Sequence, residues 1–341
     1  MIDIELYERI LGTDSTSGKE RQLALLLARW LPARSGCHVR TMEVGDGTLN
    51  VQFTWGGQEP VVTFCTHQDT VPPYIAPSFV RLASGDTDVR GRGSCDAKGQ
   101  IMAMLTACES LAAEGQSGMS LLLLAGEETG SFGAKAYAGS EPGGHWVIVG
   151  EPTDCRMVTA SKGTKAFGIE IRGKSCHSGY PEQGESAVMG FVSFINELQS
   201  TQFPIDPVMG ATTWNVGQLS SDNVQNVLSA STRFRLYFRT TAASDEAVSR
   251  HLLSLQSEKV SIEALGGDTP MAYDVLPGFD TCTVAFGSDT PRLANFRHRS
   301  MCGPGSILVA HQRGEHVLLS EVERASRQYT EMFHLIKDRG L

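Results

Sequence analysis

The sequence predicts an α/β protein with a mostly parallel sheet and a second, α+β domain inserted into it. Three short and almost wholly apolar segments, residues 61–65, 121–125 and 146–149, each end in polar residues. Strands buried on both faces have this composition, because helices cover both sides of a parallel sheet. Apolar residues at helical spacing over 101–112 supply one such covering helix. Residues 163–265 have the alternating pattern of an antiparallel sheet instead.

Capping and turn signals mark the elements that precede this sheet. Ser17 and Glu20 have the spacing of a helix-capping box, and apolar residues then recur at helical spacing. They predict a helix over about 19–31 that ends at Pro32. Residues 39–54 have the pattern of a β-hairpin, because two strand-like segments flank a glycine-rich turn.

The inserted domain and the return to the first domain complete the fold prediction. The insertion combines the predicted strands 166–172, 212–219 and 232–240 with the predicted helices 186–198 and 244–255. A strand over 281–286 and an amphipathic helix over 318–336 then resume the α/β pattern. We therefore predict a first domain of residues 1–162 and 266–341 and an inserted domain of residues 163–265.

Composition limits the class of partner. The 341-residue chain has a formal net charge of -9 and no long lysine and arginine run, which argues against nucleic acid or an anionic membrane. Its eight cysteines include no Cys-x-x-Cys pair, so they fit reduced thiols in the cytoplasm. The chain shows no signal peptide and no apolar stretch long enough to span a bilayer. We expect a cytoplasmic protein that acts on a small metabolite.

Potential metal ligands follow each of the three apolar strands. His67 and Asp69 come after the first strand, Glu127 and Glu128 after the second, and Glu151 after the third. Ligands of open α/β sheets gather at the carboxyl ends of the strands, so these side chains are expected at one edge. Each residue alone has a structural explanation, as a turn histidine or a solvated carboxylate. Their shared position favours a metal site.

The spacing of these residues also indicates a division of roles. Residues two apart in an extended segment point the same way, so Asp69 can orient the ring of His67 toward a metal. Glu127 and Glu128 repel each other unless a cation shares the site, which fits one as a ligand and one as a base. Asp96 follows a glycine-rich turn at a helix start, where its charge disfavours a bound phosphate. It either binds cations or caps the helix.

These motifs, in this order, resemble the di-zinc deacylase and exopeptidase family. The resemblance rests on His67-x-Asp69, Gly93-x-x-Asp96-x-Lys98-Gly99, Gly126-Glu127-Glu128 and Gly150-Glu151-Pro152-Thr153. The family includes acetylornithine deacetylase, succinyl-diaminopimelate desuccinylase, aminoacylases and glutamate-releasing carboxypeptidases. Because its members also carry an inserted lid and dimerisation domain, the resemblance covers nearly the whole chain. It implies that residues 1–162 and 266–341 form a zinc-binding catalytic domain.

The resemblance implies a site for two zinc ions per subunit, for which cobalt could substitute. Asp96 would bridge the two ions. His67 and Glu151 would complete one site. Glu128 and His311 would complete the other, where His311 is assigned from its place in the closing segment 303–315.

Roles in catalysis and substrate binding are implied in the same way. Glu127 would be the general base, and Asp69, beside His67, would be a further catalytic residue. His177, in Gly173-x-x-x-His177-Ser178, would stabilise the oxyanion in the partner subunit's active site, so the enzyme would be a homodimer. Asn226 and Arg239 would hold the substrate carboxylate; the less favoured alternative is a strand-edge polar residue and a surface arginine.

The implied function is zinc-dependent hydrolysis of a small N-acylated amino acid, as in the acetylornithine deacetylases of amino-acid biosynthesis. Alternatives within the family are a succinyl-diaminopimelate desuccinylase-like activity and a dipeptidase or carboxypeptidase activity. An amino-acid-binding protein that has lost catalysis is a further alternative, which the presence of the base and all five ligands disfavours. A serine hydrolase is disfavoured because the chain contains no Gly-x-Ser-x-Gly.

Overall fold

The computed structural model of the protein describes residues 1–45, 47–57 and 59–338 and divides into two compact units. Unit 1 contains Met1–Thr159, Tyr273–Cys282 and Ser288–Leu341, and unit 2 contains Ala160–Ala272 and Thr283–Gly287. The predicted insertion, residues 163–265, lies within unit 2. The last three residues of the predicted segment 266–341 lie outside the described residues. The exact domain bounds stay a prediction.

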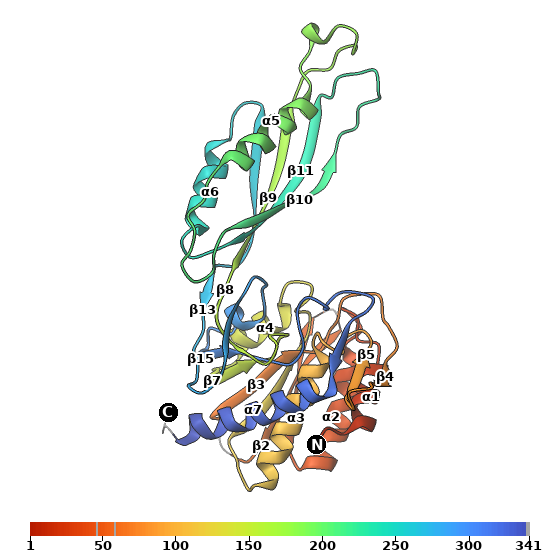
Figure 1. The fold of residues 1–341 in the computed structure, drawn as a ribbon, viewed down its shortest axis with the longest axis vertical. Helices are drawn as coiled ribbons and strands as arrows, with labels where there is room; N and C mark the ends of the chain where they lie inside the picture. The colour runs from red at the N-terminus through yellow and green to blue at the C-terminus, as the bar shows by residue number, and fades with distance from the viewer. Residues whose placement is uncertain (46, 58, 339–341) are drawn as a thin grey trace. The chain divides into compact units, whose positions relative to one another are not determined.

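A six-stranded sheet in the order β1-β2-β6-β3-β7-β15 forms the centre of unit 1 (Figure 1). Its strands are β1 (His38–Gly45), β2 (Thr48–Trp55), β3 (Val62–His67), β6 (Met119–Leu124), β7 (Gly144–Val149) and β15 (Phe296–Met301). The pairs β6–β3, β3–β7 and β7–β15 are parallel, and β2 is antiparallel to both β1 and β6. The prediction of a mostly parallel sheet is confirmed. The predicted hairpin is β1–β2, and Asp46 in its turn lies outside the described residues.

Helices cover both faces of this sheet, which explains the apolar composition of its strands. They are α1 (Ile4–Gly12), α2 (Arg21–Ser35), α3 (Lys98–Ala113), α4 (Phe132–Ser140) and α7 (Leu319–Asp338). Leu121 and Leu123 of β6 belong to a core cluster with α1, α2, α3 and α7. Leu122 and Leu124 belong to a second cluster with α4. Because alternate residues of β6 enter opposite cores, every position of the strand is buried.

Two three-stranded sheets are separate from the main sheet and from the four-stranded sheet of unit 2. One has the order β16-β5-β4, formed by β4 (Ser78–Arg81), β5 (Thr87–Arg90) and β16 (His316–Leu318). The other has the order β13-β8-β14, formed by β8 (Met157–Ser161), β13 (Met271–Ala272) and β14 (Thr281–Val284). The predicted strand 281–286 is therefore β14, and it does not join the main sheet. The strand that completes the main sheet is β15, which the sequence analysis missed because its Phe-Arg-His-Arg-Ser-Met sequence is polar.

Unit 2 is an antiparallel sheet with helices packed on it, as predicted. Its sheet has the order β10-β11-β9-β12, from β9 (Gly163–Arg172), β10 (Thr213–Ser220), β11 (Ser231–Thr240) and β12 (Val260–Gly266). Its helices are α5 (Ala187–Ser200) and α6 (Asp245–Ser254), and two single-turn helices lie at Pro181–Gln183 in unit 2 and Thr290–Arg292 in unit 1. Phe234, Leu236 and Phe238 of β11 pack in a core with α5 and α6 residues, whereas the intervening residues are more exposed.

The start and end of α2 differ from the prediction. Ser17 does not cap this helix: Glu20 is the N-cap residue, and its side chain makes no capping hydrogen bond. The hydroxyl of Ser17 donates to Asp69 instead. Pro32 does not end the helix but lies inside it, near the C-terminal end, without an amide to donate to the preceding turn. The helix ends at Gly36, whose left-handed φ of 65° lets its amide donate to the carbonyl of Pro32.

Candidate active site

The predicted ligands meet at the carboxyl edge of the main sheet. His67 ends β3, the pair Glu127 and Glu128 follows β6, and Glu151 follows β7. These strands are parallel neighbours, so the residues that follow them emerge at one edge. The next strand, β15, leads into the segment that carries His311.

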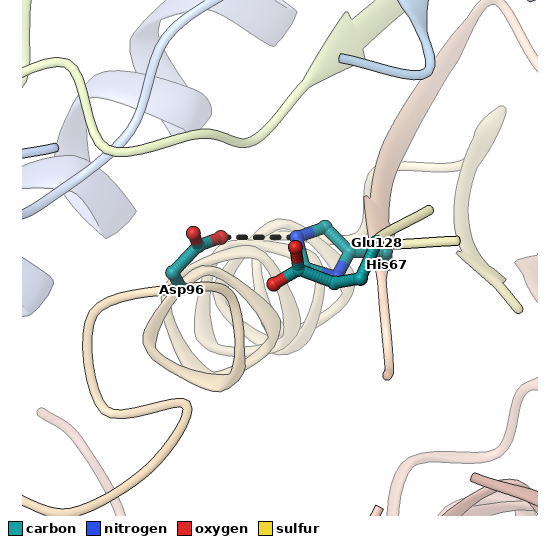
Figure 2. A group of neighbouring side chains, drawn as sticks. All are labelled: His67, Asp96 and Glu128. Carbon is teal, nitrogen blue, oxygen red and sulfur yellow. Dashed lines mark hydrogen bonds and ion pairs between the residues drawn. The ribbon is translucent and has the colours of Figure 1, made fainter. Parts of the chain in front are cut away.

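Asp96, just before α3, presents one oxygen to each of two imidazoles. Its Oδ1 lies 3.0 Å from His67 Nε2, and its Oδ2 lies 3.2 Å from His311 Nε2. His311 Nε2 also lies 3.0 Å from Glu128 Oε1. Figure 2 shows Asp96 facing His67 and Glu128, and one ligand atom from each of these three residues lies within 4.8 Å of the others. This is the arrangement expected of a carboxylate that bridges two cations.

The two remaining carboxylates of the predicted site, Glu127 and Glu151, are held in surroundings that oppose their ionisation. Burial raises the pKa of Glu151 well above its usual value; the charge of His67 opposes the rise and Asp96 adds to it. Burial likewise raises the pKa of Glu127 well above its usual value, against the charge of His67. Such a cluster of buried acids needs either protons or a cation to be stable.

The imidazoles have the opposite tendency. Hydrogen bonds to Asp96 and Glu128 raise the pKa of His311 to about 10. Burial alone would lower the pKa of His67, but Asp69 and Asp96 outweigh burial and raise it well above its usual value. The side chains therefore favour positive charge between the carboxylates. Imidazole nitrogens and carboxylate oxygens are ligands of zinc, so the donor set fits that metal.

Asp69 links the loop after β3 to the loop after β6. It is fully buried. Its Oδ1 accepts from the backbone amide of Glu127 at 3.0 Å, and its Oδ2 accepts from the amide of Glu128 at 3.3 Å. Its backbone carbonyl lies 2.9 Å from His67 Nδ1. One residue thus orients the ring of His67 and the backbone of both glutamates.

Glu315 holds the turn that carries Asp96, and the sequence analysis gave it no role. Its Oε1 accepts from the backbone amides of Gly93, Cys95 and Asp96 at 2.9, 3.2 and 3.1 Å, respectively. Its Oε2 pairs with the guanidinium of Arg92, and both side chains are buried. The only sequence signal was its position four residues after His311. Ser17 was also missed, because its spacing to Glu20 favoured a helix cap.

The other predicted residues, His177, Asn226 and Arg239, belong to unit 2. His177 forms an isolated β-bridge with Val227, and the carbonyl of Asn226 accepts from the amide of Ser178 at 2.9 Å. His177 and Asn226 are both exposed and lie close together, beside the segment that leads into β11. Arg239 lies near the other end of β11, with its guanidinium 5.0 Å from the centre of the Tyr237 ring. Within unit 2, Arg239 is not brought together with the other two residues.

Comparisons with known families and proteins agree with this fold and site. A model of the peptidase dimerisation domain of the M20 family matches residues 159–258, and a model of peptidase family M28 matches residues 50–158. The first match indicates homodimer formation. No helix in the described part of the chain is long and apolar enough to cross a membrane.

Relatives of known sequence cover most of the chain. A probable carboxypeptidase of Aspergillus fumigatus is 33% identical over an alignment that covers 99% of this chain and 87% of that protein. A probable carboxypeptidase of Aspergillus oryzae is 33% identical, over 80% of this chain and 74% of that protein. A peptidase M20 domain-containing protein of Schizosaccharomyces pombe is 29% identical, over 96% of this chain and 83% of that protein.

Solved structures share the fold at low sequence identity. A tripeptidase of Staphylococcus aureus has a TM-score of 0.82 at 18% identity, over 99% of this chain and all of that one. A dipeptidase of Saccharomyces cerevisiae has a TM-score of 0.72 at 13% identity, over 98% of this chain and 95% of that one. The identity to its relatives, the dimerisation-domain match and the grouping of candidate metal ligands agree: the chain belongs to the M20 peptidase family and is a metal-dependent amidohydrolase.

Proposed function

We propose that this protein is a zinc-dependent exopeptidase that hydrolyses a terminal amide bond of a short peptide. The proposal rests on the position of Asp96. One of its oxygens faces His67, and the other faces His311, which also lies beside Glu128. The named relatives are probable carboxypeptidases, and the structural neighbours are a tripeptidase and a dipeptidase. They favour the peptidase alternative over an acetylornithine deacetylase-like activity.

The proposed metal centre would hold two zinc ions, for which cobalt could substitute. His67, Asp96 and Glu151 would hold one ion, and Asp96, Glu128 and His311 would hold the other. This assignment is supported by the two oxygens of Asp96, each of which faces a different imidazole. Bound zinc would acidify a coordinated water and polarise the carbonyl of the scissile amide.

Glu127 is the general base of the proposed reaction. It accepts a proton from the attacking water and returns it to the nitrogen of the leaving amine. Burial raises its pKa well above the usual value for glutamate, which suits a group that must both take and give a proton. Asp69 keeps Glu127 in place through its hydrogen bond to the backbone amide of that residue.

Unit 2 supplies the substrate-binding residues of the proposal. Arg239 lies eight residues along β11 from Ser231, or about 26 Å at the rise of an extended strand. His177 and Asn226 lie beyond the Ser231 end of that strand. One copy of unit 2 therefore cannot place His177 and Arg239 on one small substrate. We propose a homodimer in which His177 of the partner subunit binds the oxyanion and Arg239 binds the substrate carboxylate.

Substitution of the base tests the proposal. Dipeptides, tripeptides, acetylornithine, acetylcitrulline and succinylated amino acids are assayed with the zinc-loaded protein and with Glu127→Gln. We expect the wild type to prefer peptides, and Glu127→Gln to lose about 10²- to 10⁴-fold in kcat while its zinc content, measured by mass spectrometry, is unchanged.

Glu8→Gln changes an exposed glutamate in α1 and serves as the matched control with wild-type activity. Substantial activity in Glu127→Gln would remove Glu127 from this role. A preference for acetylornithine would favour the deacetylase, and tight binding of amino acids without any hydrolysis would favour a binding protein.

A further inference from the structure

The carboxylate of Asp69 has a third hydrogen-bond partner that the proposed mechanism leaves unexplained. Besides the amides of Glu127 and Glu128, it accepts from Ser17 Oγ, which lies 2.9 Å from its Oδ2. The carboxylate is fully buried. A hydrogen bond to a buried, charged acceptor is costly to lose, because solvent does not replace it freely.

The backbone fixes the hydroxyl of Ser17 in this position. The amide of Ser17 donates to the carbonyl of Thr70 at 3.0 Å, and the amide of Thr70 donates to the carbonyl of Ser15 at 3.1 Å. Thr16 lies between them in a parallel bridge with Thr70, and its own amide and hydroxyl donate to Asp14. The segment before α2 is therefore joined to the loop that carries Asp69, and Ser17 is preorganised toward the carboxylate.

Glu20, three residues later, approaches the same loop cluster. Its side chain is fully buried. Burial raises its pKa, the charge of Asp69 adds to the rise, and the backbone amide of Gly126 opposes it. Ser17 and Glu20 thus lie against the loops of Asp69 and Gly126, and neither side chain caps α2.

We propose that Ser17 is a positioning residue of the amide hydrolysis, acting through Asp69. Its hydroxyl restrains the carboxylate of Asp69. That carboxylate accepts from the backbone amides of Glu127 and Glu128, and its Oδ1 lies 3.5 Å from His67 Nδ1. The inference rests on the proposed function, because it takes Glu127 as the base. The hydroxyl of Ser17 donates to Asp69 and lies near the carbonyl of Thr70, and a small displacement of the base affects the transition state most. Its loss should therefore lower kcat and leave KM nearly unchanged.

Three serine variants of the zinc-loaded, full-length protein test this role. Ser17→Ala removes the donor, and we expect kcat to fall about 10- to 100-fold, which corresponds to one hydrogen bond to a charged group. KM should change less than about twofold, since substrate binding is not altered. Ser17→Thr keeps a hydroxyl and should recover most of the loss. Ser15→Ala is the matched control, because the hydroxyl of Ser15 is also buried but has no partner among the described residues.

The outcomes separate this inference from the proposed function. Peptide hydrolysis, zinc content and thermal unfolding are measured for each variant. A wild-type kcat in Ser17→Ala, or a fall in kcat that only follows loss of zinc or of folded protein, would overturn the positioning role alone. A wild type that hydrolyses none of the amide substrates would overturn the proposed function and, with it, this inference.

Discussion

Asp289 is a buried carboxylate in unit 1 that influences the proposed centre. It is 1% exposed. Burial raises its pKa to about 7, although the charge of His67 and a hydrogen bond from Ser131 oppose the rise. Its charge in turn helps to raise the pKa of Glu127 and of Glu151. A single residue outside the ligand set therefore adds negative potential where positive ions are expected to bind.

This pKa makes the stability of the zinc-free protein depend on pH. The unfolded state loses the proton of Asp289 near pH 4, whereas the folded state keeps it to about pH 7. The unfolded state therefore binds fewer protons in this window, so the free energy of unfolding falls as the pH rises from about 4 to 7. Between pH 5 and pH 7.5, the free energy of unfolding should therefore fall less in Asp289→Asn than in the wild type. Urea unfolding of both proteins, after a chelator has removed zinc, measures this difference. The exposed Asp222→Asn is the control, and equal losses in wild type and Asp289→Asn would show that Asp289 is ionised throughout.

At the scale of an element, the first turn of α3 is packed directly against the turn that carries Asp96. A Cβ atom added at Gly99 would lie 2.4 Å from the carbonyl oxygen of Ser94. Glu315 also holds this turn, by accepting hydrogen bonds from three of its backbone amides. The close approach of α3 therefore needs a glycine, because a backbone oxygen cannot rotate away as a side chain can.

Gly99→Ala should consequently disturb both folding and metal binding. We expect a cost of about 1–3 kcal/mol in the free energy of unfolding, as for other overpacked sites, together with weaker zinc binding. Gly139→Ala in α4 is the matched control, since nothing lies within 4 Å of its added Cβ and alanine favours a helix by about 0.5–1 kcal/mol. Urea unfolding and zinc titration measure the two effects. Wild-type zinc affinity in Gly99→Ala would show that the Asp96 turn adapts without loss.

At the scale of the whole molecule, the proposed homodimer makes each active site depend on two subunits. The match to the peptidase dimerisation domain covers residues 159–258, which include His177 and Arg239. In the proposal, the separation of these residues along unit 2 would let a single copy supply only one of them to a given substrate. Activity should therefore depend on the association of two chains.

Mixing two inactive variants tests this dependence. Glu127→Gln lacks the base, and His177→Ala lacks the residue supplied to the partner. In a 1:1 mixture that is unfolded and refolded together, half of the dimers contain one of each chain and have one intact site. The mixture should therefore recover about a quarter of wild-type activity. Recovery no higher than the average of the two variants alone would show that His177 does not act across subunits.

Local patterns in the sequence were sufficient for most of the fold. Strands β3, β6 and β7 were predicted because both of their faces are buried, which leaves a recognisable apolar run. The edge strand β15 was not predicted, because partly exposed positions tolerate polar residues such as Arg297 and Arg299. His67, Asp96, Glu128 and Glu151 were predicted from their positions after strands and before a helix. His311 was assigned from the family resemblance alone.

The sequence by itself determined which elements form and which residue types are available to bind a metal, because periodicity and strand ends are local properties. Only the tertiary structure decided that Asp96 lies between His67 and His311, that Glu315 holds its turn, and that Ser17 bonds to Asp69. Ser17 and Asp69 are 52 residues apart, and Asp96 and Glu315 are 219 apart. Contacts between a side chain and distant backbone amides follow from chain topology, so they leave no local pattern to recognise. For Ser17 the local pattern predicted a helix cap, and the tertiary structure replaced the cap with a hydrogen bond to the buried carboxylate.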